Sequence, residues 1–154
     1  MAGPVKLKVD GLPALGAAFK TLTRDVQDKV ARAATNAGAQ VFKKRIAQLA
    51  PVAKEPYKIE GLIVQPKNIQ RNVVVKRLKP SETPATSEHI VVVRGKRKYG
   101  YASRVATLQE FGTVKQPAQP FFRTGAAEAA QPAVDALKKR FKTRIEKAIK
   151  DASK

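Results

Sequence analysis

The sequence predicts an α+β fold in which a long N-terminal helix packs on a small antiparallel sheet of about three strands, followed by a C-terminal helix. Between residues 12 and 46, apolar side chains recur every three or four positions, which is the period of one helix face. Residues 71–79 and 88–94 are rich in Val and Ile and have charged flanks, which is typical of strands. The helical spacing returns in residues 137–149, within a C-terminal helix expected from about Pro120 onward.

The N-terminal helix is expected to be continuous and nearly forty residues long. Asp10 is a suitable N-cap, Pro13 is tolerated in the first turn because its missing amide hydrogen is not needed there, and Pro51 ends the helix. The middle of the helix is rich in alanine and contains Gly38, so another element can approach it closely. The length of the helix also suggests that it reaches a neighbouring subunit.

The rest of the chain is expected to form turns, loops and strands. Residues 51–70 contain three prolines and keep no sustained period, so they predict an irregular inserted loop. Residues 81–87 are expected to turn between the first two strands, and residues 95–98 to join the second strand to a third at 99–105. Pro132 is expected to kink or interrupt the C-terminal helix.

The composition predicts one basic domain over residues 1–154. A chain of 154 residues with 43% apolar content supports a single modest core. It carries 31 Lys and Arg against 12 Asp and Glu, a net charge of +19 that is spread along the whole chain. Two interpretations stay open: a solvated surface whose counter-charges lie on partner subunits, or a surface that faces DNA. Lys96, Arg97 and Lys98 are the candidate DNA-facing residues.

Residue types for catalysis, metal binding and cofactor binding are scarce. The chain has no cysteine, and His89, its only histidine, lies in a Val/Ile-rich strand without an acidic cluster nearby. No glycine-rich phosphate-binding motif is present. We therefore expect no enzyme activity and no cofactor, and a structural role for His89. No apolar run approaches the roughly 18 residues of a membrane span, so no membrane partner is expected.

The most informative segment is Leu-Gln-Glu-Phe-Gly-Thr at residues 108–113, followed by Pro-Ala-Gln-Pro-Phe-Phe-Arg at residues 117–123. The glycine permits a sharp reversal, and the two prolines stiffen an extended approach to the next helix. We expect Phe111 and Phe122 to anchor this segment at a surface used for assembly. The candidate subunit or partner interface comprises Glu110, Phe111, Gly112, Thr113, Pro117, Pro120, Phe121 and Phe122.

These motifs, with the Ala-Pro-Val exit of the first helix at residues 50–52, resemble the tail-completion or head–tail joining (neck) proteins of long, non-contractile-tailed bacteriophages. The resemblance covers nearly the whole chain in order, with an apparent insertion at residues 53–60. It implies a structural virion protein, a subunit of a homo-hexameric ring that joins the DNA-filled head to the tail and lets DNA pass. The implied partners are head-completion or connector proteins, tail terminator or tail tube proteins, and passing DNA contacted without sequence preference. The implied location is the neck or tail of the virion, after assembly in the host bacterial cytoplasm.

Two other functions are weighed against this one. A basic protein that coats DNA or RNA would use the same net charge of +19 directly. Residues 97–104 partly mimic the aromatic strand of RNA-recognition motifs, with Tyr99 and Tyr101 on one strand face, although packing or subunit contact is the favoured role of both. A nuclease accessory protein is disfavoured because metal ligands are missing. Ring formation distinguishes the neck protein from a nucleic-acid coat.

Overall fold

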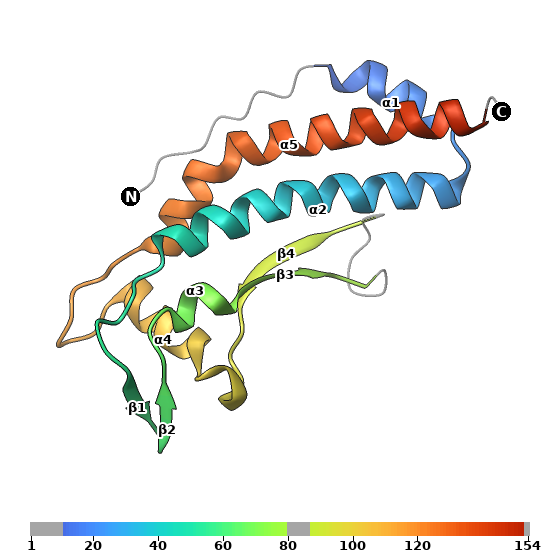
Figure 1. Cartoon of the computed structure of the whole chain (residues 1–154). Coiled ribbons are helices and arrows are strands. Elements are labelled where there is room, and N and C mark those ends of the chain that lie inside the picture. Colours follow the sequence, from blue (N-terminus) through green and yellow to red (C-terminus); the bar gives the residue numbers. More distant parts are fainter. Residues whose placement is uncertain (1–10, 80–86, 153–154) are drawn as a thin grey trace.

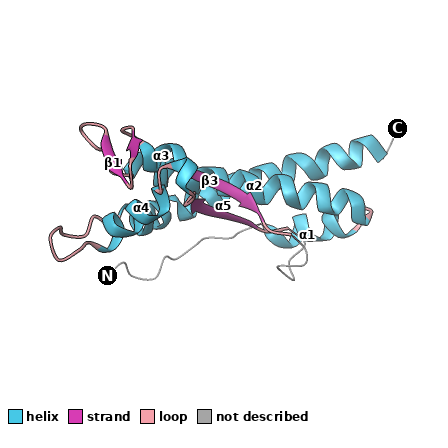
Figure 2. Cartoon of the chain, turned by 90° about the horizontal axis from the view of Figure 1, so that it is seen from below, coloured by secondary structure: helices cyan, strands magenta, loops and turns pink. Residues whose placement is uncertain are grey.

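The computed structural model describes residues 11–79 and 87–152, and it has the α+β architecture that the sequence predicts (Figure 1). Its helices are α1 (Leu12–Lys20), α2 (Arg24–Leu49), α3 (Asn68–Asn72), the 3₁₀ helix η1 (Arg97–Tyr99), α4 (Ala102–Phe111) and α5 (Phe121–Ala152). Its strands are β1 (Tyr57–Ile59), β2 (Leu62–Val64), β3 (Val73–Arg77) and β4 (His89–Val93). In Figure 2, α2 and α5 extend toward one end of the molecule, while β1, β2, α3 and α4 gather at the other.

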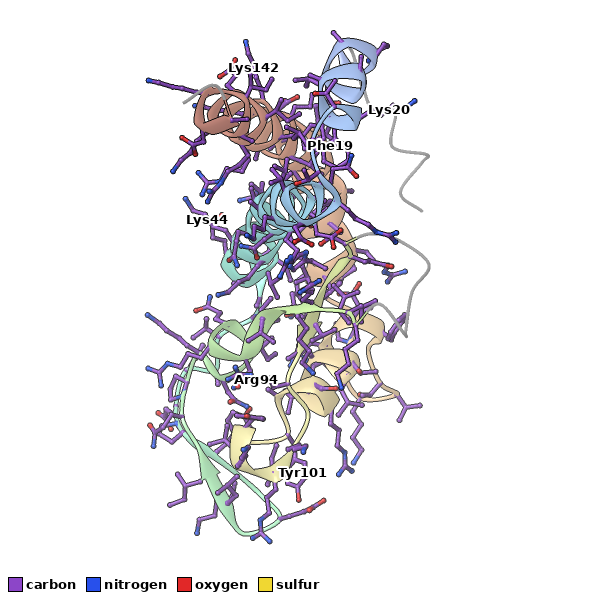
Figure 3. All side chains as sticks on the ribbon, turned by 90° about the vertical axis from the view of Figure 1, so that its right-hand side faces the viewer. Phe19, Lys20, Lys44, Arg94, Tyr101 and Lys142 are labelled. Atoms are coloured by element: carbon purple, nitrogen blue, oxygen red, sulfur yellow. The ribbon has the colours of Figure 1, made fainter. Side chains whose placement is uncertain are left out.

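The expected continuous N-terminal helix is wrong, because the chain divides into α1 and α2 at a short link. The hydroxyl of Thr21 donates to the carbonyl of Ala18 at 2.7 Å, and Thr23 is extended, with a ψ of 154°, as the N-cap of α2. Threonine side chains that bond the nearby backbone compete with helix continuation. The break lets α1 fold back onto α5, where the ring centroids of Phe19 and Phe141 lie 5.1 Å apart (Figure 3).

Pro13 and Pro51 have the effects expected of them, and of the two alternatives expected at Pro132, a kink or an interruption, the interruption does not occur. Pro13 lies in the first turn of α1 and Pro51 follows the end of α2, as the sequence predicts. The expected N-cap, Asp10, lies outside the described residues. Pro132 does not interrupt α5, which continues to Ala152. Figure 1 shows instead that the first turns of α5 are inclined to the rest of the helix, as expected where a proline removes one backbone hydrogen bond.

α2 and α5 pack side by side along small residues (Figure 1). A Cβ atom added at Gly38 would lie 3.1 Å from the carbonyl oxygen of Ala133, so the two helices approach closely, as the alanine-rich sequence predicts. The main hydrophobic core lies at one end of this pair, where α2 and α5 meet β3, α3 and α4. It comprises Ile46, Ala50, Ile69, Val73, Ala106 and Phe121.

Two separate two-stranded antiparallel sheets replace the expected sheet of about three strands. β3 and β4 occupy the first two predicted strands, in register from Val73 opposite Val93 to Arg77 opposite His89. This sheet packs against α2. Of the turn that was expected between the two strands, only its last residue lies within the described part of the chain; residues 80–86 lie outside it.

The predicted third strand is wrong, because the chain forms η1 and α4 there. Gly100 and Tyr101 both have left-handed backbone, with φ of 61° and 49°, and this conformation redirects the chain into α4. Ala102 and Ala106 are then buried four residues apart, on one face of a helix. Tyr99 and Tyr101 therefore do not share a strand face, and the likeness to an RNA-recognition strand is lost.

The irregular loop predicted at residues 51–70 is wrong in its second half, which forms the β1–β2 hairpin and the start of α3. Glu60 and Gly61 make the two-residue hairpin turn with φ of 49° and 77°, as the favoured hairpin turns require. The Glu60 carboxylate accepts a hydrogen bond from Nη1 of Arg104 at 3.1 Å. The hydroxyl of Tyr101 donates a second hydrogen bond to this carboxylate, which raises the pKa of that tyrosine. The hairpin is thereby attached to the start of α4.

Candidate assembly surface

The carboxylate of Glu110 lies at the N-terminus of α5, although Glu110 itself belongs to the end of α4. Its Oε2 accepts a hydrogen bond from the backbone N–H of Phe122 at 2.8 Å, and its Oε1 accepts one from the backbone N–H of Arg123 at 3.2 Å. The Nε of Arg123 also donates to Oε1, at 2.8 Å. Glu110 is buried, at 6% exposure. The carboxylate accepts hydrogen bonds from backbone N–H groups in the first turn of α5, which have no partner within the helix. Its negative charge is also favourable at this end of the helix dipole.

Gly112 turns the chain away from α4 in a backbone conformation that favours glycine. Its φ is 76°, and an added Cβ would lie 2.7 Å from the backbone nitrogen of Ala118. Thr113 and Gln116 then exchange two backbone hydrogen bonds, of 2.8 and 3.2 Å, which close a tight turn. The backbone N–H of Gln119 donates to the carbonyl of Gln109 at 2.7 Å. The segment between α4 and α5 is therefore attached at several points.

Apolar side chains of this segment point into solvent. Phe111 is 66% exposed and Val114, at the tip of the turn, is fully exposed, while Leu108 lies one helical turn before Phe111 and is 46% exposed. The guanidinium of Arg123 lies 5.2 Å from the centroid of the Phe111 ring. We call Leu108, Phe111 and Val114 the apolar knob. Val114 and Leu108 are absent from the candidate interface predicted from sequence, although a valine in an otherwise polar turn was an available signal.

Within the chain, Phe121 holds the segment in the core, while Phe111 is exposed, so the expected role of Phe111 at an assembly surface stays a prediction. Phe121 is 5% exposed in the main core, and its ring centroid lies 6.2 Å from that of Phe122, which is half-buried against the same core. Pro117 and Pro120 are exposed along the approach to α5. The predicted interface residues thus divide into a buried base and an exposed apolar face.

A hollow of about 440 Å³ lies beside this segment, between β4, α4 and the start of α5. Its lining includes Val91, Val93, Ala106, Phe111 and Phe122. Because the backbone N–H of Arg94 donates to the carbonyl of Asn72, the backbone groups of Val91 and Val93 point away from β3. β4 therefore presents an open edge next to the apolar hollow.

The predicted DNA-facing residues lie elsewhere, in η1 and the loop before it. Lys96, Arg97 and Lys98 are all exposed, as expected. The Nζ of Lys98 lies 5.2 Å from the centroid of the Tyr99 ring, and the guanidinium of Arg94 lies 4.8 Å from it. These cation–π contacts give the tyrosine a packing role.

His89 lies at the start of β4, opposite Arg77 on β3. Its Nδ1 is 2.9 Å from the hydroxyl oxygen of Thr35 on α2. Burial and the nearby charge of Arg77 lower the pKa of His89, which favours the neutral ring. These contacts are those of a residue that joins the sheet to α2.

Two other kinds of site are absent from the described part of the chain. No three His, Cys, Asp or Glu side chains there are grouped so that they could hold a metal ion. No helix in residues 11–79 or 87–152 has the length and apolar character needed to cross a membrane.

The sequence pattern of one protein family matches residues 14–112 of the chain. This family is HK97-gp10-like, described as "Bacteriophage HK97-gp10, putative tail-component". The match begins in α1 and ends at the turn glycine after α4, so it includes Glu110 and Phe111. No curated protein and no solved structure matches the chain.

Proposed function

The chain belongs to the HK97-gp10-like family of bacteriophage tail components, and from this premise we propose that it is a ring subunit of the phage neck. Identical subunits close a homo-hexameric ring in the virion. One face of the ring meets head-completion or connector proteins, and the other meets tail terminator or tail tube proteins. DNA passes through the ring without sequence preference, and Lys96, Arg97 and Lys98 are candidates to contact it. The work is mechanical and electrostatic, and no covalent bond is made or broken.

The observation that carries this proposal is a firmly attached segment that presents apolar side chains to solvent. Glu110 and Gly112 fix the backbone between α4 and α5, while the apolar knob of Leu108, Phe111 and Val114 stays exposed. A clustered apolar surface marks an interaction site. A preorganised backbone also loses little conformational entropy on binding.

The knob and the hollow beside β4 form one continuous apolar surface, because Phe111 belongs to the knob and also lines the hollow. In the proposed ring, this surface meets a different surface of the next subunit, which is a head-to-tail contact. Such a contact generates a closed ring when its rotation closes. In the proposed ring, the knob of one subunit contacts its neighbour, and every subunit repeats that contact.

The test is a Phe111→Ser and Val114→Ser double variant, imaged by negative-stain electron microscopy as free protein and in virions. We expect the unaltered protein to form rings, alone or on the connector, and the variant to form neither rings nor joined particles. Its melting temperature should stay near that of the unaltered protein, because exposed substitutions usually change stability by about 0.5 kcal/mol or less.

The matched control is Ile63→Ser on β2, which removes an apolar side chain that is 59% exposed outside the knob. This variant should still give joined particles. Normal joined particles from the double variant would contradict the role of the knob, and failure of the unaltered protein to form rings in any preparation would contradict the ring itself.

A further inference from the structure

A second surface lies along the seam between α2 and α5, away from the apolar knob. The seam contains a hollow of about 600 Å³. Its floor includes three alanines, Ala33, Ala37 and Ala136, and its rim carries Lys139, Arg140 and Arg144. No acidic residue of the described chain lines this hollow. We call these six residues the basic seam.

The rim cations form no ion pair with a carboxylate in residues 11–79 or 87–152. The ion pairs found there involve other cations: Arg45, Arg104, Arg123 and Lys142. A neighbouring hollow of about 370 Å³ continues the seam toward the end of α5, with Lys29 and Lys147 among its lining residues and Asp151 as its one acidic residue. Figure 3 shows Lys44 and Lys142 pointing outward from the same helix pair.

Arg144 connects the two hollows, because it lines both of them. Its Nε is buried and has no hydrogen-bond partner within the described part of the chain. Buried donors in folded proteins are nearly always hydrogen-bonded, and an unpaired donor on a cation calls for an acceptor. A small turn of this guanidinium toward the hollows that it lines would bring the Nε within reach of an anionic oxygen atom.

From these observations we infer that the basic seam binds the phosphate backbone of duplex DNA. Arg140 and Arg144 lie four residues apart and therefore follow each other by about 6 Å along the axis of α5. A row of unpaired cations above a shallow floor suits a repeating anionic backbone. The alanine floor has no aromatic or long apolar side chain of the kind that anchors a protein partner.

The inference rests on the proposed function for its source of DNA, namely the DNA that passes through the ring. The inference differs from the proposed function in the residues that contact this DNA. The seam between the long helices, rather than the Lys96–Lys98 loop, supplies most of the phosphate contacts.

The experiment measures binding of a short fluorescent DNA duplex to the full chain by anisotropy, from about 50 to 200 mM salt. One triple variant carries Lys139→Ser, Arg140→Ser and Arg144→Ser. The matched control carries Lys96→Ser, Arg97→Ser and Lys98→Ser, which removes three positive charges as well. A Lys139→Ser and Arg140→Ser double variant changes only exposed side chains and keeps the test valid if the triple variant is unstable.

We expect the seam triple variant to bind the duplex about tenfold or more weakly at low salt, with a salt slope shallower by about 2 to 3. The Lys96–Lys98 triple variant should lose clearly less affinity than the seam triple variant, because the seam supplies most of the phosphate contacts. Arg144→Lys keeps the charge but removes the buried Nε, and it should also weaken binding.

Three outcomes would overturn the inference. Equal losses in both triple variants would mean that net charge alone matters, and a loss confined to the control would assign DNA contact to the Lys96–Lys98 loop. Binding of a polyglutamate peptide to the seam more tightly than the duplex would assign the seam to an acidic protein. Electron-microscope images of the same proteins test the proposed ring separately. If the unaltered protein forms rings but the seam variant binds DNA as well as it does, the role of the seam in DNA binding is wrong and the proposed ring is not affected.

Discussion

A Cβ atom added at Gly125 of α5 would lie 2.9 Å from the Cα of Ile46 in α2, which is closer than real Cβ atoms come to other atoms. Ile46 is 1% exposed and belongs to the main core. The obstructing atom is backbone, so a side-chain rotation cannot relieve the contact. The close approach of the two long helices at this point therefore depends on the missing side chain.

We expect Gly125→Ala to lower the free energy of unfolding by about 1–3 kcal/mol, because overpacking a tight contact costs more than the gain of about 1 kcal/mol from helix propensity. Urea denaturation followed by circular dichroism measures the change. Gly16→Ala in α1 is the matched control, since an added Cβ there meets nothing within 4 Å. The control should be neutral or slightly stabilising. Equal stability of the two variants would contradict the close contact.

Glu110→Gln should lower the free energy of unfolding by about 1.5–3 kcal/mol, the range for hydrogen bonds to a charged group. The neutral amide cannot accept from Phe122, Arg123 and the Arg123 guanidinium as the buried carboxylate does. Glu128→Gln serves as the control, because its ion pair with Arg45 is exposed and such pairs contribute little. If both variants unfold at the same urea concentration, the capping role of Glu110 is wrong.

The two phenylalanines on either side of the turn should respond in opposite ways. Phe121→Ala removes a core side chain and should cost about 3–5 kcal/mol. Phe111→Ala changes a side chain that is 66% exposed and should change stability by about 0.5 kcal/mol or less, while joined particles are lost. Thermal unfolding and particle counts from the same preparations measure both effects. A loss of stability in the Phe111 variant as large as that of the Phe121 variant would contradict the exposed position of the Phe111 ring.

Helix periodicity and Val/Ile content were sufficient to predict the fold class, both long helical regions and the β3–β4 pair. They could not locate the break between α1 and α2, because the apolar period continues across it. The break is accompanied only by local side-chain hydrogen bonds, from Thr21 to Ala18 and from Gln27 to Phe19 and Leu22. The third strand failed for a similar reason. Tyr101 alternates with its neighbours as in a strand, but its left-handed backbone starts α4.

The sequence was sufficient to predict the segment that holds the candidate interface. It was not sufficient to predict which side chains of that segment are buried and which are exposed. Composition does not distinguish the buried Phe121 from the exposed Phe111, because the difference arises from where α5 begins. The cap made by Glu110 joins two helices that are separated by a turn, and no local spacing encodes that contact. The basic seam likewise combines residues of α2 and α5 that are about a hundred positions apart in the sequence.

Acidification should destabilise the protein through His89. Burial and Arg77 hold its pKa below the ordinary value of 6.5, so the unfolded chain binds a proton more readily than the folded one. The stability associated with the neutral ring is present above about pH 7 and is lost as the pH falls through 6.5 toward the folded pKa. His89→Gln removes the only histidine. In this variant, the urea concentration at the midpoint of unfolding should change less between about pH 7.5 and 5.5 than in the unaltered protein. An equally steep pH dependence in the variant would assign it to carboxylates.

A neck subunit and a protein that coats nucleic acid would use the net charge of +19 differently, so DNA binding by the free protein distinguishes them. A coat protein binds tightly as a single subunit and makes many phosphate contacts, so its affinity falls by about 10³ or more between 50 and 200 mM salt. In a ring, the basic residues of all subunits act together only after assembly, and DNA must slide past them. We therefore expect the free subunit to bind a short duplex with micromolar or weaker affinity at about 150 mM salt, in the range of non-specific binding. Anisotropy measured alongside light scattering gives affinity and oligomeric state together. Nanomolar, saturable binding by a strictly monomeric protein would contradict the neck assignment and favour the coat.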